Sequence, residues 1–186
     1  MQTLMILGSR NPKGQTARAA GALLSGVGQA GGTSDTLVLP LLRLERCRQC
    51  NDDGWGLCRA EGKCAIDDQF AEIVKKLGRA DSVVFATPVY YGDLSESLRA
   101  LTDRLRRTCT HKNMREKIEG KIAAGVCVAG GGGGGSLPCC VSLSQVLSTC
   151  GFNVLDMIPV RRQNLEAKLT RLELVGQWLA QQPAKA

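Results

Sequence analysis

Short apolar runs alternate with amphipathic stretches along the chain. Five of the runs have the length of a buried strand: Thr3 to Leu7, Asp35 to Leu39, Ser82 to Thr87, Ile122 to Ala129 and Asn153 to Val160. Between them, apolar residues recur at three- and four-residue spacing and predict helices over about 16–29, 67–77, 95–105, 137–150 and 165–181. This strict alternation predicts an α/β fold with a doubly wound parallel sheet.

Five strands favour the flavodoxin-like order 2-1-3-4-5, a three-layer sandwich with helices on both faces of a five-stranded parallel sheet. A chain of 186 residues with 44% apolar content can bury one core, so residues 1–186 are expected to form a single domain. In such a sheet, ligands bind beyond the carboxyl ends of the strands, where the order reverses between strands one and three. We therefore expect the loops after strands one, three and four to meet at one edge.

The loop after the first strand has the chemistry of a phosphate site. Residues 8–16 read GSRNPKGQT and offer hydroxyls, an amide, free backbone N–H groups and two positive charges. A helix starting near Thr16 adds unpaired N–H donors and the positive end of its dipole. Gly14 is followed by Gln15 rather than lysine, so the loop suits a terminal phosphomonoester better than a nucleoside triphosphate. The alternative is an ordinary strand-to-helix turn.

Composition and charge narrow the class of protein. The net charge is +7, but only 4% of the residues are aromatic and no recognition motif is present. A solvated basic face, or attraction to an anionic cofactor, is therefore favoured over nucleic-acid binding. The absence of an 18-residue apolar run and of a leader predicts a cytoplasmic protein without a membrane segment. Nine cysteines in such a protein are expected to be thiols rather than disulfides, which leaves metal binding, redox chemistry and inert packing open.

Four segments together resemble the NADPH-dependent FMN reductase and iron–sulfur flavoprotein group of flavodoxin-like proteins. They are GSRNPKGQT at 8–16, the cysteine segment ending in C-x-I-D-D at 64–68, ATPVYYGDLSESLRALTDR at 86–104 and GKIAAGVCVAGGGGGG at 120–135. The resemblance implies that the FMN phosphate is held by Ser9, Arg10, Asn11, Gly14, Gln15 and Thr16. It also implies that the isoalloxazine ring is lined by Pro88, Val89, Tyr90, Tyr91 and Gly92 and closed on its far side by Gly130, Gly131 and Gly132.

These residue types suit a flavin. Glycines let the backbone approach a flat ring closely, and tyrosine stacks on it, so Tyr90 and Tyr91 are assigned positioning roles. No catalytic acid or base is expected from the protein, because the hydride chemistry belongs to the flavin. The resemblance implies an oxidoreductase that passes electrons from NAD(P)H to a flavin, a quinone, another small oxidant or a protein, and that forms a homodimer or homotetramer. The rival interpretations are an iron–sulfur electron carrier and a redox-sensing regulatory module without turnover.

Residues 43–66 interrupt the α/β rhythm and contain four cysteines spaced C-x2-C-x7-C-x5-C, namely Cys47, Cys50, Cys58 and Cys64. In the iron–sulfur members that this chain resembles, a compact set of four cysteines before the Asp-Asp pair binds a [4Fe–4S] cluster. Here the second gap is longer, and Asp53 stands where a compact spacing would place the third thiolate. Gly54 and Gly56 allow the loop to fold back so that the thiolates converge. The four cysteines are thus candidate ligands, with zinc as an alternative and a metal-free packing role preferred.

The remaining candidate residues are expected to have packing or surface roles. Cys109, Cys127, Cys139, Cys140 and Cys150 are expected to be buried small hydrophobes, with a redox role for Cys139 and Cys140 as the alternative. His111 has no partner histidine or carboxylate, so it is expected at the surface. The basic stretch from Arg104 to Lys121 is interpreted as a solvated helix end, and binding of a nicotinamide 2′-phosphate is the alternative. Trp55 could cover a flavin in a neighbouring subunit.

Overall fold

The computed structural model describes residues 1–183, which contain a five-stranded parallel sheet in the order β2-β1-β3-β4-β5. Its strands are β1 (Gln2–Leu7), β2 (Thr33–Val38), β3 (Ser82–Pro88), β4 (Ile122–Ala129) and β5 (Asn153–Arg161). The flavodoxin-like order predicted from the sequence is thus confirmed. The strand boundaries differ from the prediction by at most two residues.

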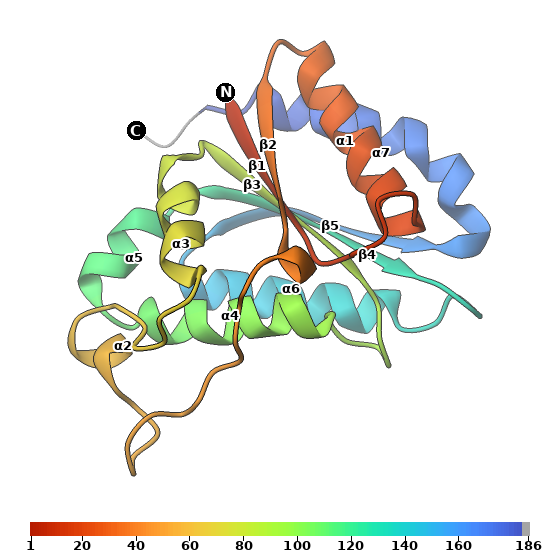
Figure 1. Cartoon of the computed structure of the whole chain (residues 1–186). Helices are drawn as coiled ribbons and strands as arrows, with labels where there is room; N and C mark the ends of the chain where they lie inside the picture. The colour runs from red at the N-terminus through yellow and green to blue at the C-terminus, as the bar shows by residue number, and fades with distance from the viewer. Residues whose placement is uncertain (184–186) are drawn as a thin grey trace.

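Helices cover both faces of the sheet and make three layers (Figure 1). One face carries α1 (Gln15–Gln29) and α7 (Leu165–Ala180), which pack against each other. The other face carries α3 (Phe70–Arg79), α4 (Glu96–Thr108), α5 (Lys112–Ile118) and α6 (Ser136–Cys150). A one-turn helix α2 (Leu57–Ala60) and two 3-10 turns, η1 (Leu39–Leu41) and η2 (Arg162–Asn164), complete the elements of the described residues.

The centre of the sheet is its most apolar part. All eight residues of β4 are buried, as are the first six of β3, whereas β2 at the edge is mostly exposed. Continuous burial explains why β3 and β4 read as unbroken apolar runs, since a strand covered on both faces needs no polar alternation. The rigid central strands therefore fix the loops that follow them.

Two glycines allow α1 and α7 to cross closely. A Cβ atom on Gly26 would lie 1.9 Å from the carbonyl oxygen of Glu173, and a Cβ atom on Gly176 would lie 2.0 Å from the carbonyl oxygen of Leu23. Any side chain at either position would force the helix axes apart. The helix that begins at the phosphate-type loop is thereby held to the C-terminal helix.

The interpretation of the basic stretch as a solvated helix end is wrong for two of its residues. The Arg104 side chain is 1% exposed and pairs with Asp68, and Lys121 is 7% exposed and donates a hydrogen bond to the Ala80 carbonyl. The stretch also contains a separate helix, α5, which begins after His111; its Nδ1 atom accepts a hydrogen bond from the Asn113 N–H at 3.2 Å. Helix α3 begins at Phe70 rather than at Asp67, so Asp68 is free to take another role.

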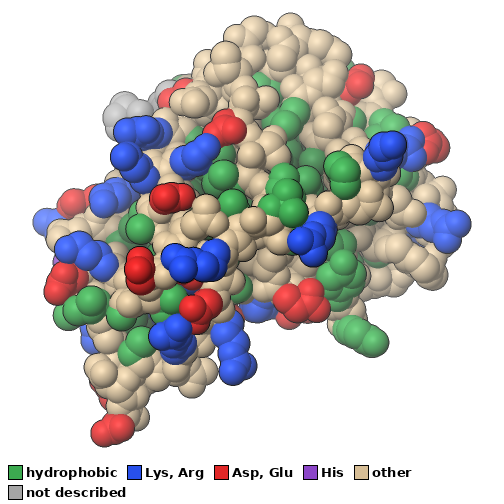
Figure 2. All heavy atoms as spheres, viewed as in Figure 1, with side chains coloured by type: hydrophobic (Ala, Val, Ile, Leu, Met, Phe, Trp, Pro, Cys, Tyr) green, Lys and Arg blue, Asp and Glu red, His purple; other side chains and the backbone are tan. Residues whose placement is uncertain are grey.

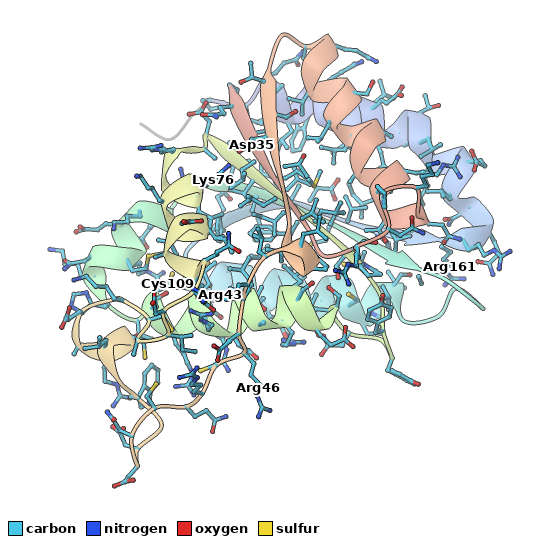
Figure 3. The ribbon with its side chains drawn as sticks, viewed as in Figure 1. Asp35, Arg43, Arg46, Lys76, Cys109 and Arg161 are labelled. Atoms are coloured by element: carbon cyan, nitrogen blue, oxygen red, sulfur yellow. The ribbon has the colours of Figure 1, made fainter. Side chains whose placement is uncertain are left out.

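The charged groups do not gather into one basic patch on the face that Figure 2 shows, where Lys and Arg side chains alternate with Asp and Glu. Figure 3 places Asp35 and Lys76 together at one side of the molecule, where they form an ion pair of 2.6 Å, and Arg161 at the other, at the carboxyl end of β5. Within residues 1–183 there is no helix of the length and apolarity that crossing a bilayer requires.

Candidate functional site

The loops after β1, β3 and β4 border one hollow at the carboxyl edge of the sheet, with a volume of about 490 Å³. This size lies in the range of small-molecule and cofactor sites. Ten of the fourteen residues predicted to contact a flavin line the hollow: Ser9, Asn11, Gly14, Gln15, Thr16, Pro88, Val89, Tyr90, Gly130 and Gly131. Arg10, Tyr91, Gly92 and Gly132 do not line it, whereas Val128 and Gly134, which sequence reasoning did not select, do.

Two close backbone approaches hold the three loops together. A Cβ atom on Gly8 would lie 2.6 Å from Ser95 Oγ, which joins the first loop to the second. A Cβ atom on Gly135 would lie 2.7 Å from the Cα atom of Gly92, which joins the second loop to the third. Only glycine fits at these contacts without displacing a neighbour. The sequence predicted that the loops converge, and the glycines at their contacts explain how they do so.

The start of α1 presents unsatisfied donors to the hollow. Gly14 precedes the helix, no side chain caps it, and its first turn contains no acidic residue. The Asn11 side chain instead accepts a hydrogen bond from the Lys13 N–H at 3.0 Å, which shapes the loop before the helix. Free N–H groups and the helix dipole together favour a bound anion here.

The loop after β3 ends in a tight turn. Tyr90 and Asp93 exchange two backbone hydrogen bonds of 3.0 Å, and the two residues between them have φ values of +51° at Tyr91 and +82° at Gly92. Positive φ at both central positions is the type I′ geometry. The turn leaves the Tyr91 side chain fully exposed, while Tyr90 is 47% exposed beside the hollow. Tyr90 is therefore the tyrosine placed to contact a ligand within one chain.

The glycine run after β4 is anchored from the next loop along. The Gln163 side-chain amide donates a hydrogen bond of 3.1 Å to the Gly131 carbonyl, and a Cβ atom on Gly133 would lie 2.6 Å from Gln163 Oε1. The turn after β5 thus holds the glycine run in place through this hydrogen bond. Sequence reasoning missed Gln163, since nothing in its local pattern marks it.

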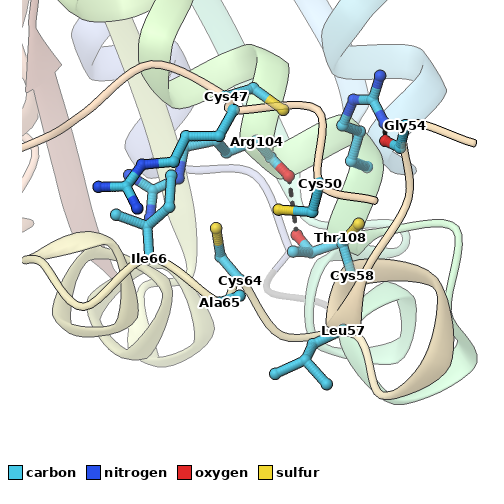
Figure 4. A pocket seen from close by; sticks show the side chains of 12 residues that line it. Cys47, Cys50, Gly54, Leu57, Cys58, Cys64, Ala65, Ile66, Arg104 and Thr108 are labelled. Atoms are coloured by element: carbon cyan, nitrogen blue, oxygen red, sulfur yellow. Dashed lines mark hydrogen bonds between the residues drawn. The ribbon is translucent and has the colours of Figure 1, made fainter. Parts of the chain in front are cut away.

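All four cysteines of residues 43–66 line a second, small cavity between this segment and α4 (Figure 4). Cys50 and Cys64 extend into it from opposite walls, and the cavity volume is about 20 Å³, roughly the room for one water molecule. Within residues 1–183 no three His, Cys, Asp or Glu side chains are close enough to hold one metal ion. The four thiols thus share the wall of a cavity, but they do not come together as a set of ligands for one metal ion.

Four cysteines are ligands that zinc and an iron–sulfur cluster both accept, and the two groups need different spacings between the sulfur atoms. A single zinc ion needs every sulfur at about 2.3 Å from one point, whereas the four cysteines of a [4Fe–4S] cluster bind four different iron atoms and stand farther apart. Among the described residues no three of these thiols come together, so the segment in this conformation is not arranged to hold either group. Because the cavity is small, cluster loading requires the segment to move outward.

Arg104 and Asp68 form a buried ion pair beside this cavity. Nη1 and Nη2 of Arg104 bind the two carboxylate oxygens of Asp68 at 2.6 and 2.8 Å, and Nη1 also donates to the Glu45 carbonyl at 3.0 Å. Burial works to raise the pKa of Asp68, but the hydrogen bonds from Arg104 and from the Glu45 and Phe70 N–H groups lower it to about 2. Glu45 precedes Cys47 and Asp68 follows Cys64, so the pair ties both ends of the cysteine segment to α4.

Sequence reasoning did not identify this pair, although a signal exists. Arg104 lies three residues after Leu101 and one before Leu105, both fully buried, so helical spacing puts it on the core side of α4. A charged residue on a buried face demands a partner of opposite charge. The partner, Asp68, lies 36 positions earlier in the chain, and no local pattern selects it over the other carboxylates.

A second arginine of α4 holds the middle of the cysteine segment. Arg107 Nη1 donates to the Gly54 carbonyl at 2.7 Å, and its guanidinium lies 4.7 Å from the ring centre of Trp55. Arg59 lies 4.1 Å from the same ring. Trp55 is thus stacked against cations within its own chain.

The other five cysteines are all buried, as predicted. Hydrogen bonding with Cys139 and Cys140, together with burial, raises the pKa of Cys127, and contact with Cys109 does the same for Cys150. A raised pKa keeps a thiol protonated and unreactive. Cys127 and Cys150 therefore serve the core, whereas hydrogen bonding with Cys127 lowers the pKa of Cys140.

Comparison with known proteins gives three findings. A family model described as NADPH-dependent FMN reductase matches residues 1–166. An iron-sulfur flavoprotein of Methanocaldococcus jannaschii is 34% identical over 131 residues, which are 70% of this chain and 65% of the relative. An iron-sulfur flavoprotein of Methanosarcina thermophila is 35% identical over 127 residues, which are 66% of this chain and 61% of the relative. The chain spans less than two thirds of the length of either relative.

Solved structures share the fold. An NAD(P)H:quinone oxidoreductase from Methanothermobacter marburgensis superposes with a TM-score of 0.71 at 21% identity, covering 100% of this chain and 99% of the other. A flavone reductase gives a TM-score of 0.71 at 18% identity, covering 97% of this chain and 62% of the other. At these identities the likeness shows a common architecture.

Proposed function

Because the chain belongs to the NADPH-dependent FMN reductase family, we propose that it is an FMN-binding oxidoreductase that takes electrons from NAD(P)H. The observation that carries this proposal is the hollow of about 490 Å³ that the loops after β1, β3 and β4 share. It lies where an open parallel sheet of this strand order binds ligands, and ten residues selected from the sequence line it.

The chain's own residues would bind and orient the cofactor. The loop before α1 and the uncapped start of this helix suit the FMN phosphate, through Ser9, Arg10, Asn11, Gly14, Gln15 and Thr16. Pro88 to Gly92 suit one side of the ring and Gly130 to Gly132 the other. Bound FMN supplies the capacity to accept a hydride and to release electrons singly or in pairs. No acid or base of the chain is assigned to the reaction.

The electron acceptor is proposed to be a small oxidant such as a free flavin or a quinone, or a protein, and the working form a homodimer or homotetramer. The fully exposed Tyr91, which follows the hollow-lining Tyr90 in the chain, supports an assembly in which another molecule covers the flavin, since an exposed aromatic ring favours contact.

Anaerobic mixing with NADPH tests the proposal. Protein loaded with FMN should lose its flavin absorbance near the visible maximum within seconds of mixing with excess NADPH, and NADH serves as the comparison. A protein that binds no FMN in a fluorescence-quenching titration would contradict the proposal. If the protein binds FMN but neither nucleotide bleaches the flavin, the proposed flavin site is supported and the proposed nicotinamide-dependent activity is contradicted.

A second candidate function is an iron–sulfur flavoprotein that carries electrons. The four cysteines of residues 43–66 favour it, and two relatives are named iron-sulfur flavoproteins. Cys47, Cys50, Cys58 and Cys64 would hold a [4Fe–4S] cluster, which supplies one-electron transfer. Anaerobically purified protein should then contain about four iron and four sulfide per chain. Absence of both after anaerobic purification would remove this candidate and leave the reductase.

A further inference from the structure

Four basic side chains at the carboxyl edge of the sheet have no acidic partner. Within residues 1–183, no ion pair includes Arg10, Lys13, Arg161 or Arg162. Arg10 and Lys13 lie in the loop that we assign to the FMN phosphate, whereas Arg161 ends β5 and Arg162 begins the turn η2 that follows it. The two arginines after β5 are therefore available for a further anionic group.

Arg161 is held against the glycine run (Figure 3). Its register partner is Ala129, the last residue of β4, and the next residue, Gly130, lines the hollow. A Cβ atom on Gly133 would lie 3.2 Å from both Cβ and Cδ of Arg161, so the arginine stem lies along the run. The Arg161 N–H donates a hydrogen bond of 2.8 Å to Asn164 Oδ1, which fixes the backbone from which this side chain starts. The guanidinium is thus carried at the rim of the hollow.

The space beside the glycine run is open. A Cβ atom added to Gly130, Gly132 or Gly134 would meet no described atom within 4 Å, and none of the three has a positive φ. Neither packing nor backbone geometry within the described residues therefore requires a glycine at these positions. The missing side chains instead leave room for a bound molecule to lie against the backbone on both sides of Gly133, where Arg161 lies.

We propose that Arg161 binds the 2′-phosphate of NADPH and thereby makes the protein select NADPH over NADH as its electron donor. The inference rests on the proposed function. Hydride transfer requires the nicotinamide to lie against the flavin ring in the hollow, so the adenosine end of the dinucleotide lies outside the hollow. Arg161 is not among the residues that line the hollow, and it follows directly after β5 at its edge. It is therefore placed to contact the adenosine end, where the 2′-phosphate is the one group that NADH lacks.

An arginine suits this role for two reasons. Its planar guanidinium can donate two parallel hydrogen bonds to one phosphate, which a lysine ammonium cannot do. Because Arg161 has no carboxylate partner among the described residues, binding a phosphate breaks no existing ion pair. The restraint of its stem by Gly133 also lowers the side-chain entropy that is lost on binding.

The basic stretch from Arg104 to Lys121, the alternative that the sequence offered for this phosphate, does not fit the role at either end. Arg104 is 1% exposed and is bound to Asp68. Lys121 is 7% exposed, donates to the Ala80 carbonyl and directly precedes β4, so it lies at the amino edge of the sheet, opposite the hollow. Arg161 lies at the correct edge and is exposed.

Anaerobic stopped-flow reduction of FMN-loaded Arg161→Gln tests the proposal. The rate of flavin bleaching is measured against the concentration of NADPH and, separately, of NADH. We expect the half-saturating NADPH concentration to rise by about fivefold or more, because two charge-assisted hydrogen bonds are lost. The limiting rate with NADPH and both values with NADH should stay as in the wild type. Arg79→Gln is the matched control, because Arg79 is an exposed arginine that lies beside Gln2 at the amino edge of the sheet; it should change neither nucleotide.

The outcomes separate this inference from the proposed function. Equal losses with NADPH and NADH, or no loss with either, would overturn the role of Arg161 and leave the reductase standing. A loss of FMN affinity in Arg161→Gln, measured by fluorescence quenching before the kinetics, would make Arg161 part of the flavin site and also overturn the inference. A wild-type protein whose bound FMN is bleached by neither nucleotide would overturn the nicotinamide-dependent activity and this inference together.

A measurement on the wild type covers the case in which Arg161→Gln does not fold. Adenosine 2′,5′-bisphosphate and adenosine 5′-monophosphate are compared as inhibitors of NADPH-dependent bleaching. The first should inhibit at a lower concentration, because it carries the 2′-phosphate that Arg161 binds. Equal inhibition by the two would contradict a 2′-phosphate site. Arg161→Lys, which keeps the charge without the fork, should lose less NADPH affinity than Arg161→Gln, and a larger loss would overturn the proposed contact.

Discussion

Gly92 and Gly135 lie in contact between the loops that follow β3 and β4. A Cβ atom added to Gly135 would be 2.7 Å from the Cα atom of Gly92, and both residues have left-handed backbones, with φ of +82° at Gly92 and +81° at Gly135. The tyrosine turn and the glycine run are thus locked together by two residues without side chains. The walls of the hollow depend on this contact.

Gly135→Ala should weaken FMN binding. The new methyl group must displace the loop that ends in Gly92, and alanine is strained at positive φ, so the hollow loses its shape. We expect a loss of affinity of at least about fivefold, which corresponds to roughly 1 kcal/mol, measured by quenching of FMN fluorescence. Gly21→Ala, at a helix position with nothing within 4 Å of the added atom, is the control and should bind FMN as the wild type does.

Ser9→Asp should also weaken FMN binding, for an electrostatic reason. It places a carboxylate in the loop between β1 and α1, at the hollow where we propose the phosphate binds. Repulsion between the new carboxylate and the FMN phosphate, both partly solvated, is worth on the order of 1 kcal/mol. This corresponds to roughly a fivefold loss of affinity. Ser34→Asp on the exposed edge strand β2 adds the same charge far from the hollow. Equal affinity of the two variants would mean that the phosphate lies elsewhere.

Gly176→Ala should lower stability without changing the chemistry of the site. Its Cβ atom would lie 2.0 Å from the Leu23 carbonyl oxygen, so α1 and α7 must separate. Overpacking of this kind costs about 1–3 kcal/mol, seen as a lower urea midpoint. Gly21→Ala lies on α1 with open space around it and should instead raise stability by up to about 1 kcal/mol. If Gly176→Ala stabilised the protein as Gly21→Ala is expected to do, the close crossing of α1 and α7 would be contradicted.

Acid should destabilise the protein partly through Asp68. Its folded-state pKa of about 2 lies below the ordinary value of 3.8, so the ion pair with Arg104 stabilises the fold above pH 4 and this contribution is lost as the pH falls towards 2. The contribution is roughly 2 kcal/mol by linkage. Urea midpoints at pH 6 and pH 3 should differ more for the wild type than for Asp68→Asn. The same pH dependence in both proteins would show that Asp68 is not held by Arg104.

Much of the fold was predictable because it follows from local patterns. The unbroken apolar runs of β3 and β4 and the helical spacing in α1 and α6 each identify an element, and their alternation leaves few topologies. Convergence of the three loops then follows from the strand order alone. The separate helix α5 was missed because His111 starts it within a stretch whose charge pattern resembles a continuing helix end.

The details of the site depend on contacts that no local pattern reveals. Tyr90 and Tyr91 are adjacent in sequence, yet the type I′ turn puts the first beside the hollow and the second fully in solvent. Arg104 and Asp68 are 36 positions apart, and their pairing is visible only once α4 is packed against the segment before α3. Gln163 supports the glycine run from an element that follows it in the chain.

A crystal structure of the protein soaked with FMN will show whether the hollow is the flavin site. We expect density for the phosphate at the start of α1, against Ser9 to Thr16, and density for the ring between the Pro88 to Gly92 turn and the glycine run. Flavin density anywhere else on the protein, or none at a concentration that saturates binding in solution, would contradict this expectation.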